Sequence, residues 1–180
     1  MKKILYILAI AATTLLASCQ KDPIGGTKVQ DLSGQWYVQV DIVDASGNVV
    51  LEDFNGGRTI LLTYNTASDA DNVLYVDDLK DFWTFKVQVP CSLSSKTFGS
   101  ESPVANEYYD CNVTLSNGKI VVDGATTPSE QKADYIEFLV NFDDDDLTSQ
   151  GYPGVSYPEA YGGVAYRISG WRYTGFVNDD

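Results

Sequence analysis

Apolar and polar residues alternate along most of this chain. In the stretch QWYVQVDIV, Trp36, Val38 and Val40 fall on one face, and the residues between them are mostly polar. This period of two is typical of an antiparallel strand with one buried face. Similar runs occupy 49–54, 58–64, 72–78, 82–90, 107–115, 119–124, 134–142 and 163–176. The pattern predicts a chain built of short strands.

Turn residues separate these runs. They recur about every ten positions, which is typical of an all-β barrel or sandwich. The pair Asn117-Gly118 predicts a type I′ hairpin, because both residues tolerate positive φ, with 119–124 as the returning strand. We expect one all-β domain over 31–180, a single antiparallel up-and-down β-barrel of about eight strands.

The first residues differ from the rest of the chain. Lys2 and Lys3 precede the apolar run 4–16, which is too short to span a bilayer and is typical of a secretory signal. The letters LLASC that follow resemble a lipoprotein signal, in which the chain is cut before Cys19 and the cysteine is acylated. An ordinary signal with an incidental cysteine is the alternative. We expect a signal peptide at 1–18.

Residues 19–30 combine the acylated cysteine with a polar stretch that contains Pro and Gly, so they predict a flexible tether. Acyl chains on Cys19 would anchor the protein to a membrane, because each buried CH₂ contributes about 0.8 kcal/mol. Gln20 stands where some lipoproteins carry the aspartate that retains them at the inner membrane. By this resemblance we expect the protein to be located in the cell envelope, anchored to the outer membrane on its periplasmic or its surface side.

Acidic residues outnumber basic ones, with 25 against 12 and a formal net charge of −13. Removing the signal takes away Lys2 and Lys3 but no acidic residue. Nucleic acid and anionic lipid headgroups would be repelled, so we expect neither as a direct partner of the folded domain. Basic partners and divalent cations stay open.

Cysteines at two further positions bear on the redox state. Cys91 and Cys111 share the parity of the apolar residues in their strands, and same-face residues of paired strands can meet. Because an exported protein matures in an oxidising compartment, we expect a disulfide between them. Two unbridged, buried thiols are the alternative.

The head of the first strand carries a short motif. Gly34-Gln35-Trp36 follows the letters DLS and resembles the signature of lipocalins and the wider calycin superfamily. The resemblance implies a tryptophan at the closed end of a barrel, under a short helical turn, with an arginine of the last strand across its ring. Such a contact contributes about 0.5–2 kcal/mol. Arg172 is the expected partner rather than Arg167, because the end of an antiparallel last strand lies beside the start of the first.

Over most of its mature length the chain is similar to lipocalin-like lipoproteins of gut Bacteroidetes, among them the family labelled "lipid-binding putative hydrolase". The shared pattern is the lipoprotein signal, the polar tether, LSGQWYV at 32–38, an acidic β-rich body and an aromatic last strand. The resemblance implies a calycin-like barrel and a small hydrophobic ligand. The sequence contains no recognised motif that would support the hydrolase activity in this label.

A barrel of about eight strands either encloses a small ligand or is filled by its own side chains. Alternation does not distinguish the two, and the resemblance favours a pocket. The expected lining residues are Val38, Val40, Leu62, Tyr64, Phe85, Val87, Tyr109, Phe138 and Tyr166. At the mouth, Tyr152, Tyr157 and Tyr161 in the loop 150–163 form either a lid or a simple packed connection.

Recognised catalytic motifs are missing from the sequence. The chain has no histidine, which excludes Ser-His-Asp and Cys-His catalysis and histidine-ligated metals. We expect no catalytic residue, no metal and no cofactor. Hydrolysis by carboxylates alone stays open, but Glu137 lies opposite the apolar face of its strand and is expected in solvent. Residues 143–146 either bind calcium or, lacking the spacing of a calcium loop, form a solvated turn.

Three functions remain. The first is a lipid-anchored barrel that binds a small hydrophobic molecule non-covalently. The second is a cell-envelope interaction module with a filled barrel and a protein or glycan partner. The third, which the sequence favours least, is a carboxylate-based hydrolase. A hollow barrel favours the first function, a packed interior favours the second, and facing carboxylates in a cleft favour the third.

Overall fold

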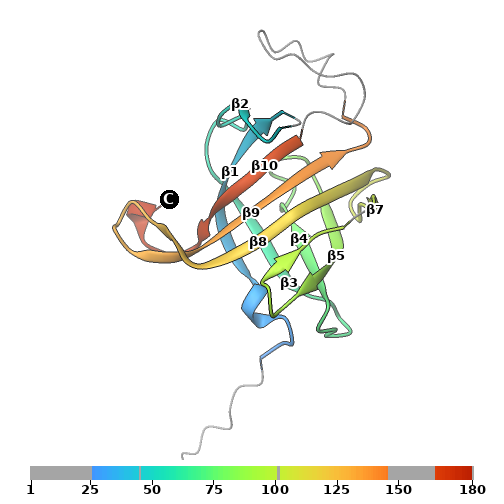
Figure 1. The fold of residues 1–180 in the computed structure, drawn as a ribbon, viewed down its shortest axis with the longest axis horizontal. Helices are drawn as coiled ribbons and strands as arrows, with labels where there is room; N and C mark the ends of the chain where they lie inside the picture. The colour runs from blue at the N-terminus through green and yellow to red at the C-terminus, as the bar shows by residue number, and fades with distance from the viewer. Residues whose placement is uncertain (1–25, 45, 101, 146–164, 180) are drawn as a thin grey trace, which may run out of the picture.

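The computed structural model describes residues 26–44, 46–100, 102–145 and 165–179, and these form one all-β domain (Figure 1). Its elements are the 3-10 turn η2 (Gln30–Leu32), the strands β1 (Gly34–Val43), β2 (Val49–Leu51), β3 (Thr59–Asn65), β4 (Val73–Asp77), β5 (Lys86–Ser92), β6 (Thr97–Phe98), β7 (Val104–Ala105), β8 (Asn112–Thr126), β9 (Lys132–Phe142) and β10 (Ala165–Arg172), and the 3-10 turn η3 (Val177–Asp179). Across these segments, no helix has the length and apolar character needed to cross a bilayer.

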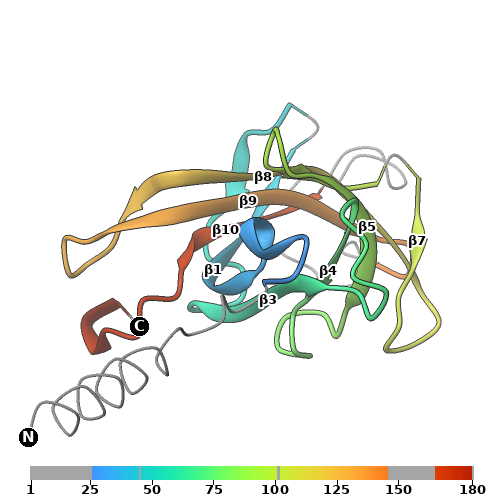
Figure 2. The same cartoon turned by 90° about the horizontal axis from the view of Figure 1, so that it is seen from below.

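Eight of the strands close into an antiparallel barrel in the order β1-β3-β4-β5-β6-β8-β9-β10, and β10 pairs back with β1. The remaining strands, β2 and β7, lie outside this ring and pair with β1 and β8. Figure 2 shows the same ring from below. The predicted antiparallel barrel is confirmed, and the alternation in the sequence explains it, because each strand sends every second side chain inward.

The closed end of the barrel is built around Trp36, which has no exposed surface. The Arg172 guanidinium lies 4.4 Å from the centroid of the indole ring, and its Nη1 donates a 2.7 Å hydrogen bond to the carbonyl of Ser33. The indole N–H donates to the Thr63 hydroxyl at 2.8 Å. A Cβ at Gly34 would lie 2.1 Å from Arg172 Nη1, so the motif needs glycine there. The first strand, the last strand and β3 therefore meet at one side chain.

The predicted hairpin at Asn117-Gly118 is wrong. β8 runs straight through these residues, and Asn117, with φ of 55°, forms a bulge at a shift in the β8–β9 register. Gly118 pairs with Phe98 of β6, and a Cβ at Gly118 would lie 2.3 Å from the Phe98 carbonyl oxygen. Positive φ and the missing side chain thus serve a bulge and a close strand contact. The segment 119–124 continues β8.

Leu62 and Tyr64 do not point into the barrel, contrary to the prediction. β3 pairs with β1 so that Leu61 lies opposite Trp36, and residues in direct register share a face. Leu61 is 1% exposed, whereas Leu62 and Tyr64 are only half-buried on the outer face. The run RTILLTY is apolar at adjacent positions, so its alternation does not fix which set faces inward.

The predicted disulfide is also wrong, because Cys91 and Cys111 are both free thiols. Cys91 lies near the end of β5. The carbonyl of Cys111 accepts from the backbone N–H of Asn106, whose side chain accepts from the N–H of Lys86 at the start of β5. The extended strand between Lys86 and Cys91 spans about 16 Å, whereas bridged cysteines have Cα atoms within about 7 Å.

Beyond the barrel, β8 and β9 continue as a two-stranded arm, residues 121–134, which projects sideways (Figure 1). The C-terminal tail, residues 173–179, folds back against its tip. Asp179 is 2% exposed, and its carboxylate accepts from the N–H of Ser129 at 2.7 Å and the hydroxyl of Thr174 at 2.5 Å. These bonds fix the tail to the arm.

Replacing Arg172 by leucine keeps an apolar stem beside Trp36 but removes the cation, the hydrogen bond to Ser33 and the ion pair with Asp134. We expect the free energy of unfolding, measured by urea denaturation, to fall by about 2 kcal/mol. Arg172→Lys keeps the charge without the planar fork and should give an intermediate loss. A loss below about 0.5 kcal/mol for the leucine variant, the range of an exposed ion pair, would contradict the closing role.

Acid should release the tail through Asp179. Burial alone raises the pKa of this carboxyl, but the hydrogen bonds from Ser129 and Thr174 outweigh burial and lower the pKa from 3.8 to about 2. The stabilisation is therefore complete above the unfolded pKa and is lost as the pH falls through the folded one. The Ser129 amide resonance should titrate between about pH 4 and pH 2. Asp179→Asn should abolish that titration, and its persistence would assign the effect to another group.

Candidate functional site

The barrel interior is packed. Six of the predicted lining residues are at most 1% exposed and lie in one hydrophobic cluster: Val38, Val40, Phe85, Val87, Phe138 and Tyr166. Val40, Phe85, Val87 and Phe138 have no exposed surface. A cavity wide enough for water along these side chains would leave part of their surface accessible. These residues therefore form core rather than the wall of an open pocket.

The barrel mouth, opposite Trp36, is covered by aromatic rings. The cover loop, residues 78–85, joins β4 to β5 and brings Phe82 and Trp83 over the ends of β9 and β10. Trp83 stacks on Phe142 at 4.7 Å between centroids, and Phe82 meets Tyr166 edge-on at 5.1 Å. The sequence predicted a strand from residue 82, but β5 begins at Lys86. Access to the core from this end requires these rings to move.

Asp78 holds the cover loop in place. The residue is 1% exposed, and its carboxylate accepts hydrogen bonds from the backbone N–H groups of Lys80, Trp83, Thr84 and Phe85 at 2.7–2.9 Å. Sequence reasoning missed this residue. The available signal was an aspartate directly after an apolar strand and before a short loop, a position where the side chain replaces backbone acceptors.

A groove of about 770 Å³ opens on the barrel wall, lined by residues 90–92, 97–100 and 116–119. We call it the wall groove. It lies where the barrel wall has the fewest strand pairings. There β6 is only two residues long, and two residue pairs join it to β5 and two to β8. Farther along β8, the outer strand β7 continues this path. The groove thus lies beside a barrel strand, β6, that is only two residues long.

Apolar groups dominate the wall groove. Phe98 is 5% exposed, and its ring meets Phe138 of the core at 5.7 Å, edge to face. Pro90 and Cys91 lie beside it, and burial together with the charge of Asp71 raises the pKa of the Cys91 thiol, so this thiol is neutral at physiological pH. The groove therefore offers apolar surface backed by the core.

Lys119 supplies a positive charge at the edge of the wall groove. Its Nζ lies 2.8 Å from Glu137 Oε1, and that carboxylate also accepts from the hydroxyl of Tyr135. Burial raises the pKa of Glu137, but the bonds from Lys119 and Tyr135 outweigh burial and lower it. Glu137 is therefore an ionised partner of Lys119, and the arrangement gives it no role as a proton donor at neutral pH.

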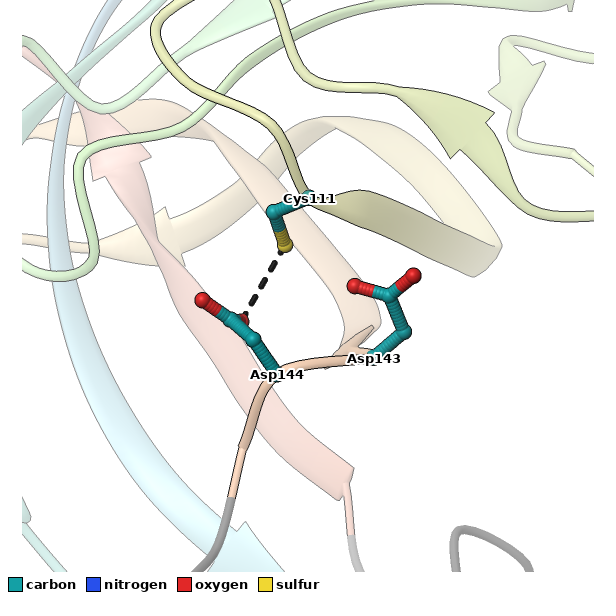
Figure 3. Close-up of side chains that lie close together, drawn as sticks. All are labelled: Cys111, Asp143 and Asp144. Atoms are coloured by element: carbon teal, nitrogen blue, oxygen red, sulfur yellow. Dashed lines mark hydrogen bonds between the residues drawn. The ribbon is translucent and has the colours of Figure 1, made fainter.

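Cys111, Asp143 and Asp144 bring a sulfur and carboxylate oxygens within 4.8 Å of one another, close enough to hold a cation (Figure 3). Cys111 Sγ donates to Asp144 Oδ1 at 3.1 Å. Asp143 turns towards β8, where it accepts from the N–H and side-chain amide of Asn112. Burial and the Asp144 bond raise the pKa of the Cys111 thiol to about 12. A protonated thiol is a poor nucleophile, and both carboxylates already have protein donors.

Tyrosines and carboxylates on the outer face of β3 and β4 form a closed network. Tyr64 and Tyr108 both donate to Asp77, each at 2.8 Å, and burial together with this carboxylate raises both pKa values. Tyr75 donates to Glu107 at 2.6 Å. Because these hydroxyls have partners within the chain, we interpret the network as stabilising this face of the barrel and not as a ligand-binding site.

The other predicted site residues are placed as follows. Tyr109 follows β7, is partly buried against the core and donates to Asp144 at 2.8 Å. Cys19 and the mouth tyrosines Tyr152, Tyr157 and Tyr161 lie outside the described residues. Their predicted roles stay predictions.

Asp144→Asn should make the Cys111 thiol more reactive. Removing the adjacent negative charge lowers the thiol pKa towards its ordinary value, which raises the thiolate fraction at mildly alkaline pH. We expect iodoacetamide to alkylate Cys111 about tenfold faster in this variant than in the unchanged protein. Peptide mass spectrometry measures the rate. Asp143→Asn is the matched control, because that carboxylate bonds to Asn112 and raises the Cys111 pKa less than Asp144 does, so it should change the rate less. Equal rates in both variants would contradict the assigned contact.

Comparison with known proteins identifies a family for this chain. A family model described as "Lipid-binding putative hydrolase" matches residues 21–177, a span that includes every strand of the barrel. A search of curated proteins finds no match. The chain belongs to the lipid-binding putative hydrolase family.

Proposed function

We propose that this protein is an outer-membrane-anchored lipoprotein whose barrel binds a small hydrophobic, lipid-like ligand non-covalently in the wall groove. The observation that carries the proposal is an apolar groove in the wall of a barrel whose described core is already filled. The family match supports a lipid as the class of ligand. The site differs from the interior pocket that the sequence favoured.

The wall groove fits an acyl chain. Its volume of about 770 Å³ lies within the range of about 300–1,000 Å³ that small-molecule sites occupy. A chain laid against Phe98, Pro90 and Cys91 would gain about 25 cal/mol per Å² of apolar surface removed from water. Lys119 at the edge suits an anionic headgroup, with Glu137 as its partner when the groove is free. No covalent chemistry is needed for this function.

The anchor rests on the sequence. The letters LLASC after an apolar run support acylation of Cys19, and Gln20 supports the outer membrane. The described chain begins at Gly26 and reaches β1 through η2, so a short tether separates the barrel from the proposed anchor. Such a protein would hold its groove near a source of lipid.

The packed interior favours a second function, a cell-envelope interaction module with a protein or glycan partner. In that case the wall groove would bind no lipid. The outer network of Tyr64, Tyr75 and Tyr108 gives this function little support, because its hydroxyls are bonded within the chain and Lys80 and Lys86 lie over Tyr108 and Tyr75. Lipid binding is therefore preferred.

Thr97→Trp tests the site. Thr97 is an exposed lining residue of the wall groove, so an indole there fills the groove without entering the core. The probe is a polyene fatty acid whose fluorescence rises when it leaves water. We expect its dissociation constant to increase by about tenfold or more when the apolar floor is covered.

Ser94→Trp is the matched control, because Ser94 is exposed in the turn between β5 and β6 and does not line the groove. It should leave the dissociation constant unchanged. Probe binding that survives Thr97→Trp would move the ligand elsewhere in the barrel. Failure of the unmodified protein to bind this probe, or any species from an envelope lipid extract, would favour the interaction module.

A further inference from the structure

Exposed apolar side chains gather on the arm and the C-terminal tail. Among the described residues, seven large hydrophobic side chains are exposed. Five of them belong to the arm or the tail: Val121, Val122, Tyr173, Phe176 and Val177. Phe176 is 55% exposed and Val177 is 87% exposed. Single exposed hydrophobics are ordinary, but a group of them on one projecting feature marks a contact surface.

The tail is held in an ordered shape. Asp179 bonds to the arm through Ser129, and the N–H of Asp179 donates to the carbonyl of Phe176 at 2.9 Å. The N–H of Phe176 approaches the hydroxyl of Thr174 at 3.3 Å. These bonds close a short turn, η3, that presents Phe176 and Val177 outward. Holding apolar side chains in water in this way costs free energy unless something outside the chain covers them.

This surface lies on the side of the barrel where the tether enters. The N–H of Tyr173 donates to the carbonyl of Gln35 at 2.8 Å, and the preceding residue, Arg172, bonds to Ser33. The tail therefore leaves the barrel beside the first residues of β1. Figure 2 shows the arm and the tail projecting on one side of the barrel. A membrane anchor ahead of the tether would bring this side close to a bilayer.

We propose that the arm and the C-terminal tail form a bilayer-contact surface, in which Phe176 and Val177 enter the interface of a zwitterionic membrane. The net charge of −13 opposes anionic headgroups. On the arm, Lys132 bonds to Thr126 and Asp134 to Arg172, and Asp123 and Glu130 add two exposed carboxylates. The contact is therefore apolar, and added anionic lipid should weaken it.

A partner strand is a poorer occupant of the same feature. The free edge of β8 along the arm is interrupted by a second register shift between Val121 and Ala125, with Asp123 at φ of 52°. A bulge of this kind twists the edge away from a straight partner and hinders strand addition. The bilayer does not depend on strand register, because it meets side chains only.

The contact surface also adjoins the proposed ligand site. Lys119, at the edge of the wall groove, is two positions before Val121, where the arm begins. A barrel resting on the arm and tail would hold the wall groove next to the membrane surface, where lipids exchange. This link rests on the proposed function, whereas the contact surface rests on its own exposed side chains.

Vesicle flotation tests the contact surface. All barrel pairings lie between Gly34 and Arg172, so a chain from residue 20 onward contains the whole domain and lacks the acylated cysteine. The double variant Phe176→Ser, Val177→Ser should partition into phosphatidylcholine vesicles about tenfold less than the unchanged chain. Phosphatidylglycerol added to the vesicles should lower partitioning further.

The matched control is Val50→Ser, Leu79→Ser, which removes two exposed side chains of 43% and 45% exposure from outside the arm and tail and should partition normally. An equal loss in the control, or vesicle binding that survives in the Phe176/Val177 variant, would overturn the proposal. So would a dimer without vesicles that dissociates in that variant, since the surface would then bind a second copy. Binding of the fatty-acid probe is measured without vesicles. A loss of probe binding at the wall groove and a loss of vesicle partitioning by this surface are therefore separate results.

Discussion

Trp36 is the side chain on which the closure of the barrel depends. Its ring lies under the Arg172 guanidinium, its N–H donates to Thr63, and the Thr63 hydroxyl donates in turn to the carbonyl of Leu32 at 2.6 Å. The first strand, the last strand, β3 and η2 are thus tied through one buried indole. A closed barrel needs such a link, because the strands that meet at its seam are the most distant in sequence.

Filling the barrel moves the question of ligand binding from the interior to the wall. The side chains around Phe85 and Phe138 are fully buried in one hydrophobic cluster, so a ligand there would have to displace them. The wall is weakest at β6, where bare backbone at Gly118 lets two strands approach and leaves surface beside Phe98 open. An apolar groove at that point follows from the two-residue length of β6 and needs no cavity inside the barrel.

Alternation and turn spacing in the sequence predicted an all-β barrel or sandwich, and the resemblance of Gly34-Gln35-Trp36 to the lipocalin signature implied the closing contact between Trp36 and Arg172. Alternation failed where local patterns allow two outcomes. RTILLTY is apolar at adjacent positions, so pairing with β1 decided that Leu61 faces inward. Asn117-Gly118 fits a hairpin and a bulge equally well, and the contact with Phe98 selected the bulge. The wall groove could not be foreseen, because it arises from strands that meet only in the folded chain.

The two ends of the barrel cover their apolar side chains in different ways. The arm and the tail differ from both, because they leave apolar side chains exposed. At one end a cation and hydrogen bonds cover Trp36, and at the other a loop ordered by Asp78 lays Phe82 and Trp83 over the core. A chain that covers its rings so fully gains no stability by leaving Phe176 in water. Nothing among the described residues covers Phe176 fully, and the proposed tether would place a bilayer within its reach.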